Sequence, residues 1–215
     1  MWVGLASWIV RDSPLPEVTV GSVLPGAAVG IIGDVGATTR PTQAALLGRV
    51  DQMWRFTGDV VDAPQEAVWP ESASTKEWLS EFFLAGHDLT VRARARDLTA
   101  DLLTVGQRLT LTGRANLLSK HEVAELVDAP EHFTNDWRVA GIRATVYQKS
   151  WAPRADGGYE GTQGETLNQI ELPDLDVARH VELFERWEGR AGGRWVPTTG
   201  FDYLLDLAPT HRDGV

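Results

Sequence analysis

The alternation of hydrophobic and polar residues is most regular between residues 88 and 149, where it predicts three β-strands. In residues 89–96 the apolar side chains occupy one parity, and the other parity carries a threonine and three arginines, Thr90, Arg92, Arg94 and Arg96. Residues 108–115 and 137–149 repeat this alternation. A period of two places the two sets on opposite faces of a strand. We therefore expect an antiparallel sheet with one face suited to a core and the other lined with cationic side chains.

Shorter hydrophobic segments predict further strands at residues 2–10, 18–24 and 44–56, and closing strands around Trp195 and residues 201–207. Between residues 26 and 36 the chain carries four spaced glycines. Their spacing matches neither the dinucleotide-binding fingerprint nor a phosphate-binding P-loop, so we interpret the segment as a turn between strands. Residues 152–169, which are also rich in glycine, predict a long flexible loop.

Three segments predict helices. Residues 74–77 and 119–122 are capping-box patterns, in which a serine and a glutamate satisfy the free amides of a first helical turn. Apolar residues at helical spacing follow each pattern, which predicts helices over residues 75–85 and from 119 to about 128. A third helix is expected over residues 174–188, with Gly189 beyond its end.

These elements predict an α+β protein, built from a strongly curved antiparallel sheet or small β-barrel, OB-like or SH3-like, with two to three helices. We expect residues 1–215 to form a single domain. The alternative is two packed small barrels, about 1–87 and 88–215, which would explain a short echo between residues 19–24 and 104–109. Folds of this kind host many functions, so the fold class alone indicates none.

Charge and cysteine content narrow the classes of partner. The formal net charge of −10 disfavours a general nucleic-acid binder and an anionic membrane surface, because long-range repulsion opposes the encounter. The sequence has no cysteine, which excludes disulfides, thiolate nucleophiles and cysteine-ligated metals. It also lacks an apolar run of membrane-spanning length and a basic N-terminal opening, so we expect a cytoplasmic protein with no membrane contact.

The cationic sheet face is the strongest candidate for chemistry. Guanidinium groups bind carboxylates and phosphates in bidentate fashion, and a neighbouring tyrosine can stack a base or sugar. The candidate ligand-binding residues on this face are Arg92, Arg94, Arg96, Arg114, Arg143 and Tyr147. The alternative is internal neutralisation, in which the acidic residues of segment 122–131 fold over the arginines and pair with them.

A second group of polar residues has a weaker claim. His121 and Glu125 are four residues apart, which places two metal-ligand types on one helix face, and His132 follows. The pattern is not the zincin motif, and we interpret it as an exposed acidic helix with no metal. His180 and Glu182 are interpreted as surface residues. No nucleophile elbow or ordered serine–histidine–aspartate set occurs in the sequence.

The resulting hypothesis is a non-enzymatic binding or adaptor protein that needs no cofactor. It would engage a protein partner or a small anionic ligand through the arginine-lined face. The alternative is a hydrolase or transferase acting on a small phosphorylated or carboxylated metabolite, which requires an acid–base pair that the sequence does not nominate.

Scattered short pieces resemble an uncharacterised actinobacterial protein family of unknown function. They include the opening Trp-Val-Gly-Leu-Ala-Ser-Trp at residues 2–8, Val-Ala-Gly-Ile-Arg-Ala at 139–144 and the closing Phe-Asp-Tyr-Leu-Leu-Asp-Leu at 201–207. The family pattern carries Cys-Cys-Gly near its N-terminus, and this chain has no cysteine. The resemblance implies an actinobacterial origin and brings no activity or site residues.

Overall fold

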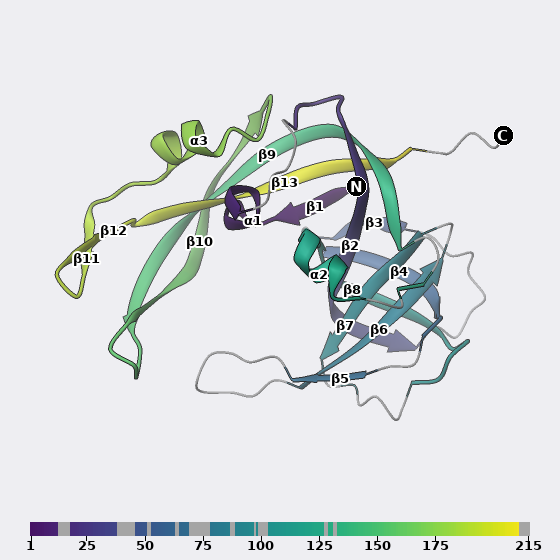
Figure 1. Ribbon diagram of the computed structural model, residues 1–215. Coiled ribbons are helices and arrows are strands. Elements are labelled where there is room, and N and C mark those ends of the chain that lie inside the picture. Colours follow the sequence, from purple (N-terminus) through teal and green to yellow (C-terminus); the bar gives the residue numbers. More distant parts are fainter. Residues whose placement is uncertain are drawn as a thin grey trace. The chain divides into compact units, whose positions relative to one another are not determined.

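A computed structural model describes residues 1–12, 18–37, 46–50, 53–62, 65–68, 78–86, 89–96, 98, 103–126, 129–130 and 133–210. The protein is mostly β, with a few short helices (Figure 1). Contacts divide the chain into two compact units. Unit 1 comprises Met1, Val3–Leu24 and Arg138–Ala208, and unit 2 comprises Trp2, Pro25–Trp137 and Pro209–Val215.

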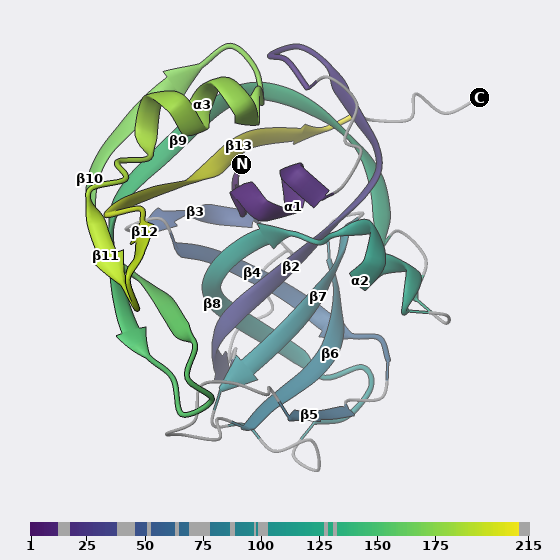
Figure 2. The ribbon, with the colours of Figure 1, turned by 60° about the vertical axis from the view of Figure 1, so that its left-hand side comes forward.

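Unit 2 contains a curved mixed sheet whose strand pairings close a ring. Strand β2 pairs in parallel with β7 and antiparallel with β8, and antiparallel pairings then join β7 to β6, β6 to β4 and β4 to β8 (Figure 2). Strands β3 and β5 extend this ring by pairing with β4 and β6. The strands are β2 (Val23–Ala37), β3 (Leu46–Val50), β4 (Met53–Val60), β5 (Gln65–Val68), β6 (Trp78–Gly86), β7 (Leu89–Arg96) and β8 (Arg108–Leu117).

The ring is not a barrel, which corrects the OB-like or SH3-like expectation. The β4–β6 seam joins only two register positions, Asp59 to Ala85 and Val60 to Leu84. The sequence also predicted that β7 and β8 are neighbours in one antiparallel sheet. In the structure β2 lies between them. The curved, largely antiparallel β-structure itself is confirmed.

The period-two alternation correctly places the apolar side chains of β7 and β8 in the core of unit 2, although Thr90 on the other parity of β7 is buried as well. In β7 the side chains of Leu89, Val91, Ala93 and Ala95 are all buried. In β8 the same is true of Leu109 and Leu111. Burying this apolar area is the main favourable contribution to folding.

The glycine-rich segment at residues 26–36 lies in strand β2 and is not the predicted turn. Gly33 of β2 and Gly113 of β8 are register partners, and a Cβ on either residue would collide with the backbone of the opposite strand. The glycines therefore permit a close strand crossing, which is a common role of glycine inside a sheet.

One predicted helix of unit 2 is wrong and another is confirmed. Residues 78–86 form strand β6, and residues 75–77 lie outside the described part of the chain. Helix α2 (Lys120–Ala124) begins as predicted, with a complete capping box between Ser119 and Glu122. It ends earlier than expected, with Glu125 as its C-cap. The predicted strand over residues 44–56 is instead divided between β3 and β4, which pair antiparallel.

Unit 1 contains the strand order β10-β9-β13-β1 together with a small hairpin, β11 with β12. Its buried side chains include Ile142, Phe201, Tyr203 and Leu205. The elements of this unit are β1 (Trp2–Leu5), α1 (Ser7–Asp12), β9 (Thr134–Pro153), β10 (Tyr159–Leu172), α3 (Val177–Phe184), β11 (Gly189–Ala191), β12 (Arg194–Val196) and β13 (Thr199–Pro209). Three strand ends are assigned to unit 2: Trp2 of β1, residues 134–137 of β9 and Pro209 of β13.

Several boundaries in unit 1 differ from the predictions. The expected loop at residues 152–169 is mostly the β9–β10 hairpin, whose turn contains Gly157 at φ 81°. The first predicted strand ends at Leu5, and α1 follows it. The segment expected as a strand at residues 18–24 makes a single bridge, from Thr19 to Asp174, before β2 begins. Within the described residues no helix is both long and apolar enough to cross a membrane.

Candidate anion-binding site

The arginines of β7 share one face of the unit 2 sheet, as their alternation predicts. Arg92 is opposite Phe83 of β6 and beside Gly30 of β2, whereas Arg94 is opposite Glu81 and beside Ile32. Residues directly opposite one another on paired strands project to the same face. Glu81 is therefore placed on the same face as both arginines.

A single carboxylate bridges these two arginines. Arg92 Nη2 donates to Glu81 Oε1 at 2.6 Å, and Arg94 Nε donates to Glu81 Oε2 at 2.9 Å. The side chains are only 11%, 12% and 16% exposed for Arg92, Arg94 and Glu81. This corrects the expectation of a solvent-exposed row. This neutralising carboxylate comes from β6. The described acidic residues of segment 122–131, Glu122 and Glu125, instead contact Ser119 and His121.

Arg92 keeps hydrogen-bonding capacity that the protein does not use. Its Nε and Nη1 atoms are buried and have no hydrogen-bond partner among the residues that the structure describes. A buried donor without an acceptor costs on the order of 1–3 kcal/mol, and more when the group is charged. The arrangement can accept a further carboxylate or phosphate oxygen.

An apolar cluster borders Arg92 at one end of this face. Phe83, which is opposite Arg92, packs edge-to-face against Phe133 with ring centroids 5.1 Å apart. Ala28 completes the buried centre of the cluster, and further side chains pack against it: Leu118, Val123, Leu126 and Ala129. Because nearby apolar groups lower the local dielectric, they strengthen the interaction of an arginine with an anion.

Leu118 and helix α2 hold this apolar cluster beside the arginine. A Cβ at Gly30 would lie 2.8 Å from Leu118 Cδ2, so the leucine covers the glycine that is next to Arg92 in the sheet. Val123 comes from α2, whose first turn is fixed by the hydrogen bonds between Ser119 and Glu122. Leu118 and α2 therefore place apolar side chains beside the strand position of Arg92.

The other two predicted arginines of unit 2 have different positions. Arg114 is exposed on β8 and is opposite Ile32, which puts it in the same cross-sheet row as Arg94. Arg96 is opposite Leu79, but its side chain lies outside the described residues. Arg114 can add positive charge to an anion bound near Arg94, across the intervening strand β2.

Arg143 and Tyr147 belong to unit 1 and have partners of their own. Arg143 Nη2 donates to Glu171 Oε1 at 2.9 Å across β9 and β10. The ring of Tyr147 is buried against Gly200, and burial, reinforced by the charge of Asp202, raises the pKa of its hydroxyl to about 12. The expectation that Tyr147 presents a free ring for stacking is therefore corrected.

The predicted pair His121 and Glu125 is an exposed contact on one side of α2. Nε2 of His121 lies 3.1 Å from Glu125 Oε1, and both side chains are mostly exposed. In the described part of the chain, no three histidine, aspartate or glutamate side chains are grouped so that they could hold a metal ion. His132 lies outside that part.

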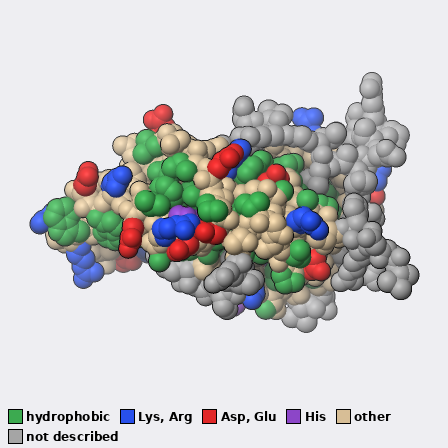
Figure 3. All heavy atoms as spheres, turned by 90° about the horizontal axis from the view of Figure 1, so that it is seen from above, with side chains coloured by type: hydrophobic (Ala, Val, Ile, Leu, Met, Phe, Trp, Pro, Cys, Tyr) green, Lys and Arg blue, Asp and Glu red, His purple; other side chains and the backbone are tan. Residues whose placement is uncertain are grey.

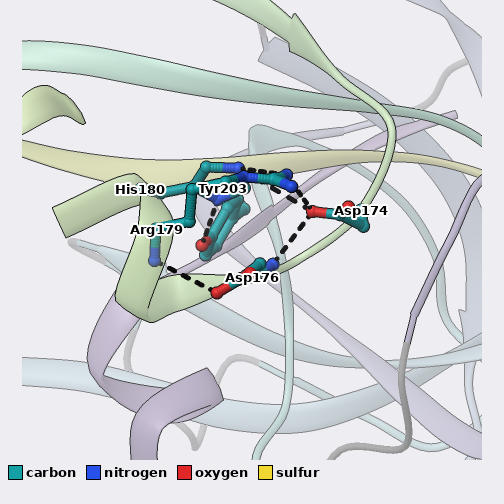
Figure 4. Close-up of polar contacts among 5 residues, drawn as sticks. All are labelled: Asp174, Asp176, Arg179, His180 and Tyr203. Atoms are coloured by element: carbon teal, nitrogen blue, oxygen red, sulfur yellow. Dashed lines mark hydrogen bonds and ion pairs between the residues drawn. The ribbon is translucent and has the colours of Figure 1, made fainter. Parts of the chain in front are cut away.

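Unit 1 contains a buried histidine that the sequence interpretation missed. His180 is fully buried, although it was expected at the surface. Its Nδ1 lies 2.9 Å from Tyr203 Oη, and its Nε2 lies 3.2 Å from Arg179 Nη2 (Figure 4). The ring also stacks on Phe184 at 5.7 Å. Its spacing from Val177 and Phe184 places it on the apolar side of α3, and this was the available signal.

The contacts of His180 match one neutral tautomer of its ring. A guanidinium can only donate, so Nε2 accepts from Arg179, and Nδ1 carries the proton that is donated to Tyr203. Burial, together with the charge of Arg179, lowers the pKa of His180. Burial would raise the pKa of Asp174, but hydrogen bonds from the Asp176 amide and from Arg179 hold it below its ordinary value. The cluster therefore anchors α3 with a neutral histidine.

Asp202 is a half-buried acid in unit 1. It accepts a hydrogen bond from the Ser7 amide at 3.0 Å, at the start of α1. Burial raises its pKa, and the hydrogen bonds from Ser7 and the charge of Lys149 oppose part of this rise. These contacts tie α1 to β13, which is a structural role.

No protein-family model matches the chain, and neither a curated protein nor a solved structure does. The resemblance to an actinobacterial family therefore stays a prediction.

Proposed function

We propose that the protein is a binding protein that holds an anionic group, a carboxylate or a phosphate, at Arg92 and Arg94 on the outer face of β7. The observation that carries this proposal is the pair of buried, unpartnered donors on Arg92. Their cost is offset when an anion supplies acceptors, because charge-assisted hydrogen bonds are about twice as strong as neutral ones.

Glu81 acts as an internal competitor for the incoming anion. Its two oxygens occupy one donor of Arg92 and one of Arg94. A ligand that enters from solvent displaces this carboxylate or shares the arginines with it. Either way, the negative charge of Glu81 weakens ligand binding, and its removal strengthens binding.

A small anion or an acidic side chain fits this site better than a nucleic acid does. The whole chain carries a formal charge of −10. On the face shown in Figure 3, acidic and basic side chains are interspersed and do not form one basic field. A polyanion needs an extended cationic surface, whereas a single carboxylate or phosphate needs only the local arginine pair.

The test is a binding titration of the full chain with inorganic phosphate and with acetate, at an ionic strength held constant with sodium chloride. We expect saturable binding that Arg92→Lys weakens about tenfold or more, which corresponds to about 1.4 kcal/mol. Lysine keeps the charge but removes the guanidinium donors. Glu81→Gln is expected to tighten binding.

The matched control is Arg108→Lys. Arg108 makes a satisfied two-point contact with Asp59, at 2.9 Å and 3.0 Å, on the same sheet. This variant is expected to bind anions as the wild type does. Equal weakening by Arg92→Lys and Arg108→Lys, or no saturable binding by any variant, would overturn the proposal.

A further inference from the structure

Strand β10 forms one end of the unit 1 sheet. It runs from Tyr159 to Leu172 and pairs antiparallel with β9, and no other described strand pairs with it. One row of its backbone amides and carbonyls therefore faces away from β9. Figure 1 shows the two strands as a long hairpin. Such an edge is a template for the backbone of another extended segment.

The exposed side of β10 has only some of the usual protections of an edge strand, namely acidic side chains and a register irregularity near its middle. All side chains from Tyr159 to Asn168 are exposed, and the strand contains neither proline nor lysine. Its register with β9 shifts only between Gln163 and Asn168. The stretches Tyr159–Gln163 and Asn168–Leu172 on either side pair regularly with β9 and keep the extended geometry that an added strand requires.

The charge of β10 disfavours a second copy of this chain as the added strand. The strand carries Glu160, Glu165 and Glu171 and no basic residue. An antiparallel copy that places Glu160 opposite Glu171 brings like charges together at both ends, and a parallel copy in register does so at all three positions. Like charges directly opposite one another are destabilising. The overall charge of −10 adds to this repulsion.

The same charge favours a basic partner. Glu171 is already paired with Arg143, but no ion pair joins Glu160 or Glu165 to a described lysine or arginine. We infer that β10 binds an extended basic segment of a partner protein by strand addition, with the lysine or arginine side chains of that segment beside Glu160 and Glu165. Backbone hydrogen bonds would supply affinity, and the glutamates would select the charge.

The test uses the full chain and a synthetic nine-residue peptide in which threonine and lysine alternate. Binding is measured by titration, and amide hydrogen exchange is followed by mass spectrometry in the presence and absence of the peptide. We expect slower exchange confined to residues 159–172. Methylation of alternate backbone nitrogens of the peptide should weaken binding at least tenfold, because it removes the donors that pair with the strand.

The charge requirement is tested separately with Glu160→Lys combined with Glu165→Lys. This variant should lose binding of the basic peptide. The control is Glu182→Lys, which makes the same type of charge change at an exposed position of α3 and should bind normally. Equal binding of the methylated peptide, protection outside residues 159–172, or no binding of the basic peptide would each overturn the inference.

Discussion

Glu81 Oε1 lies 2.6 Å from Arg92 Nη2, and this contact satisfies only part of the arginine, whose Nε and Nη1 are buried without acceptors in the described part of the chain. The carboxylate of Glu81 thus accepts hydrogen bonds from both arginines, because Arg94 Nε donates to its second oxygen. An incompletely satisfied, largely buried cation is costly in a folded protein. The proposed anion removes that cost, which links the stability of unit 2 to ligand binding.

The first prediction concerns the stability of unit 2 without ligand. Glu81→Gln leaves two partly buried arginines side by side, so the free energy of unfolding should fall by about 3 kcal/mol. Phosphate should restore more stability to this variant than to the wild type, since it replaces the lost charge. Urea denaturation with and without phosphate measures both effects.

A surface ion pair of unit 2 provides the control for Glu81→Gln. The side chains of Asp59 and Arg108 are about two-fifths exposed, at 42% and 38%. Asp59→Asn should therefore cost less than about 1 kcal/mol. A similar loss in the two variants would show that the Glu81 contact is an ordinary surface pair.

The second prediction concerns the crossing of β2 and β8. In Gly113→Ala the new methyl group would meet the backbone at Ile32 and Gly33, neither of which can rotate away. We expect a loss of about 3 kcal/mol or more, the upper range for overpacking. Gly158→Ala in the β9–β10 turn is the control, since its nearest neighbour is the Asp156 side chain at 3.1 Å. Thermal denaturation of both variants distinguishes a tight crossing from a tolerant one.

The third prediction concerns pH. The pKa of His180 is lowered on folding, so the unfolded chain binds the proton more tightly than the folded chain does. The neutral histidine therefore stabilises the fold fully above its unfolded pKa of about 6.5, and this contribution is lost as the pH falls below that value. The groups that face the His180 ring are Arg179, Asp174 and Tyr203. Of these, only Arg179 opposes protonation of the ring by its charge.

Urea denaturation between pH 7.5 and pH 5 measures this linkage. His180→Gln should be less stable at pH 7.5 but should show a flatter dependence on pH than the wild type. His121→Gln, at an exposed position, should keep the wild-type slope. An unchanged slope in His180→Gln would mean that other groups control the acid sensitivity.

The arginine face was predictable from the sequence, but its acidic partner was not. The two-residue alternation in β7 places Arg92 and Arg94 on the face opposite to the buried apolar side chains of the same strand. Residues 78–86, by contrast, follow a capping pattern with apolar residues at helical spacing, although sheet pairing makes them a strand. If residues 78–86 are assigned to a helix, the pairing of Glu81 with Arg94 cannot be foreseen, because only a strand places these two residues opposite one another. Tertiary pairing overrides local propensity here.

The order of strands was similarly out of reach of local patterns. When only the local sequence is considered, glycines such as Gly33 indicate a turn. Gly33 lies at a strand crossing because it pairs with Gly113, which comes 80 residues later in the chain. His180 differs, because its spacing to Phe184 already indicated burial. Its neighbouring charges, Arg179 and Glu182, concealed this signal.

The most direct test of anion binding is the side-chain NMR resonance of Arg92 Nε–Hε during titration of the full chain with phosphate at constant ionic strength. The account predicts that this resonance shifts saturably and that its hydrogen exchange slows, whereas the Arg108 resonance does not respond. A response of Arg108 equal to that of Arg92, or an Arg92 resonance that stays unchanged to saturating phosphate, would contradict the account.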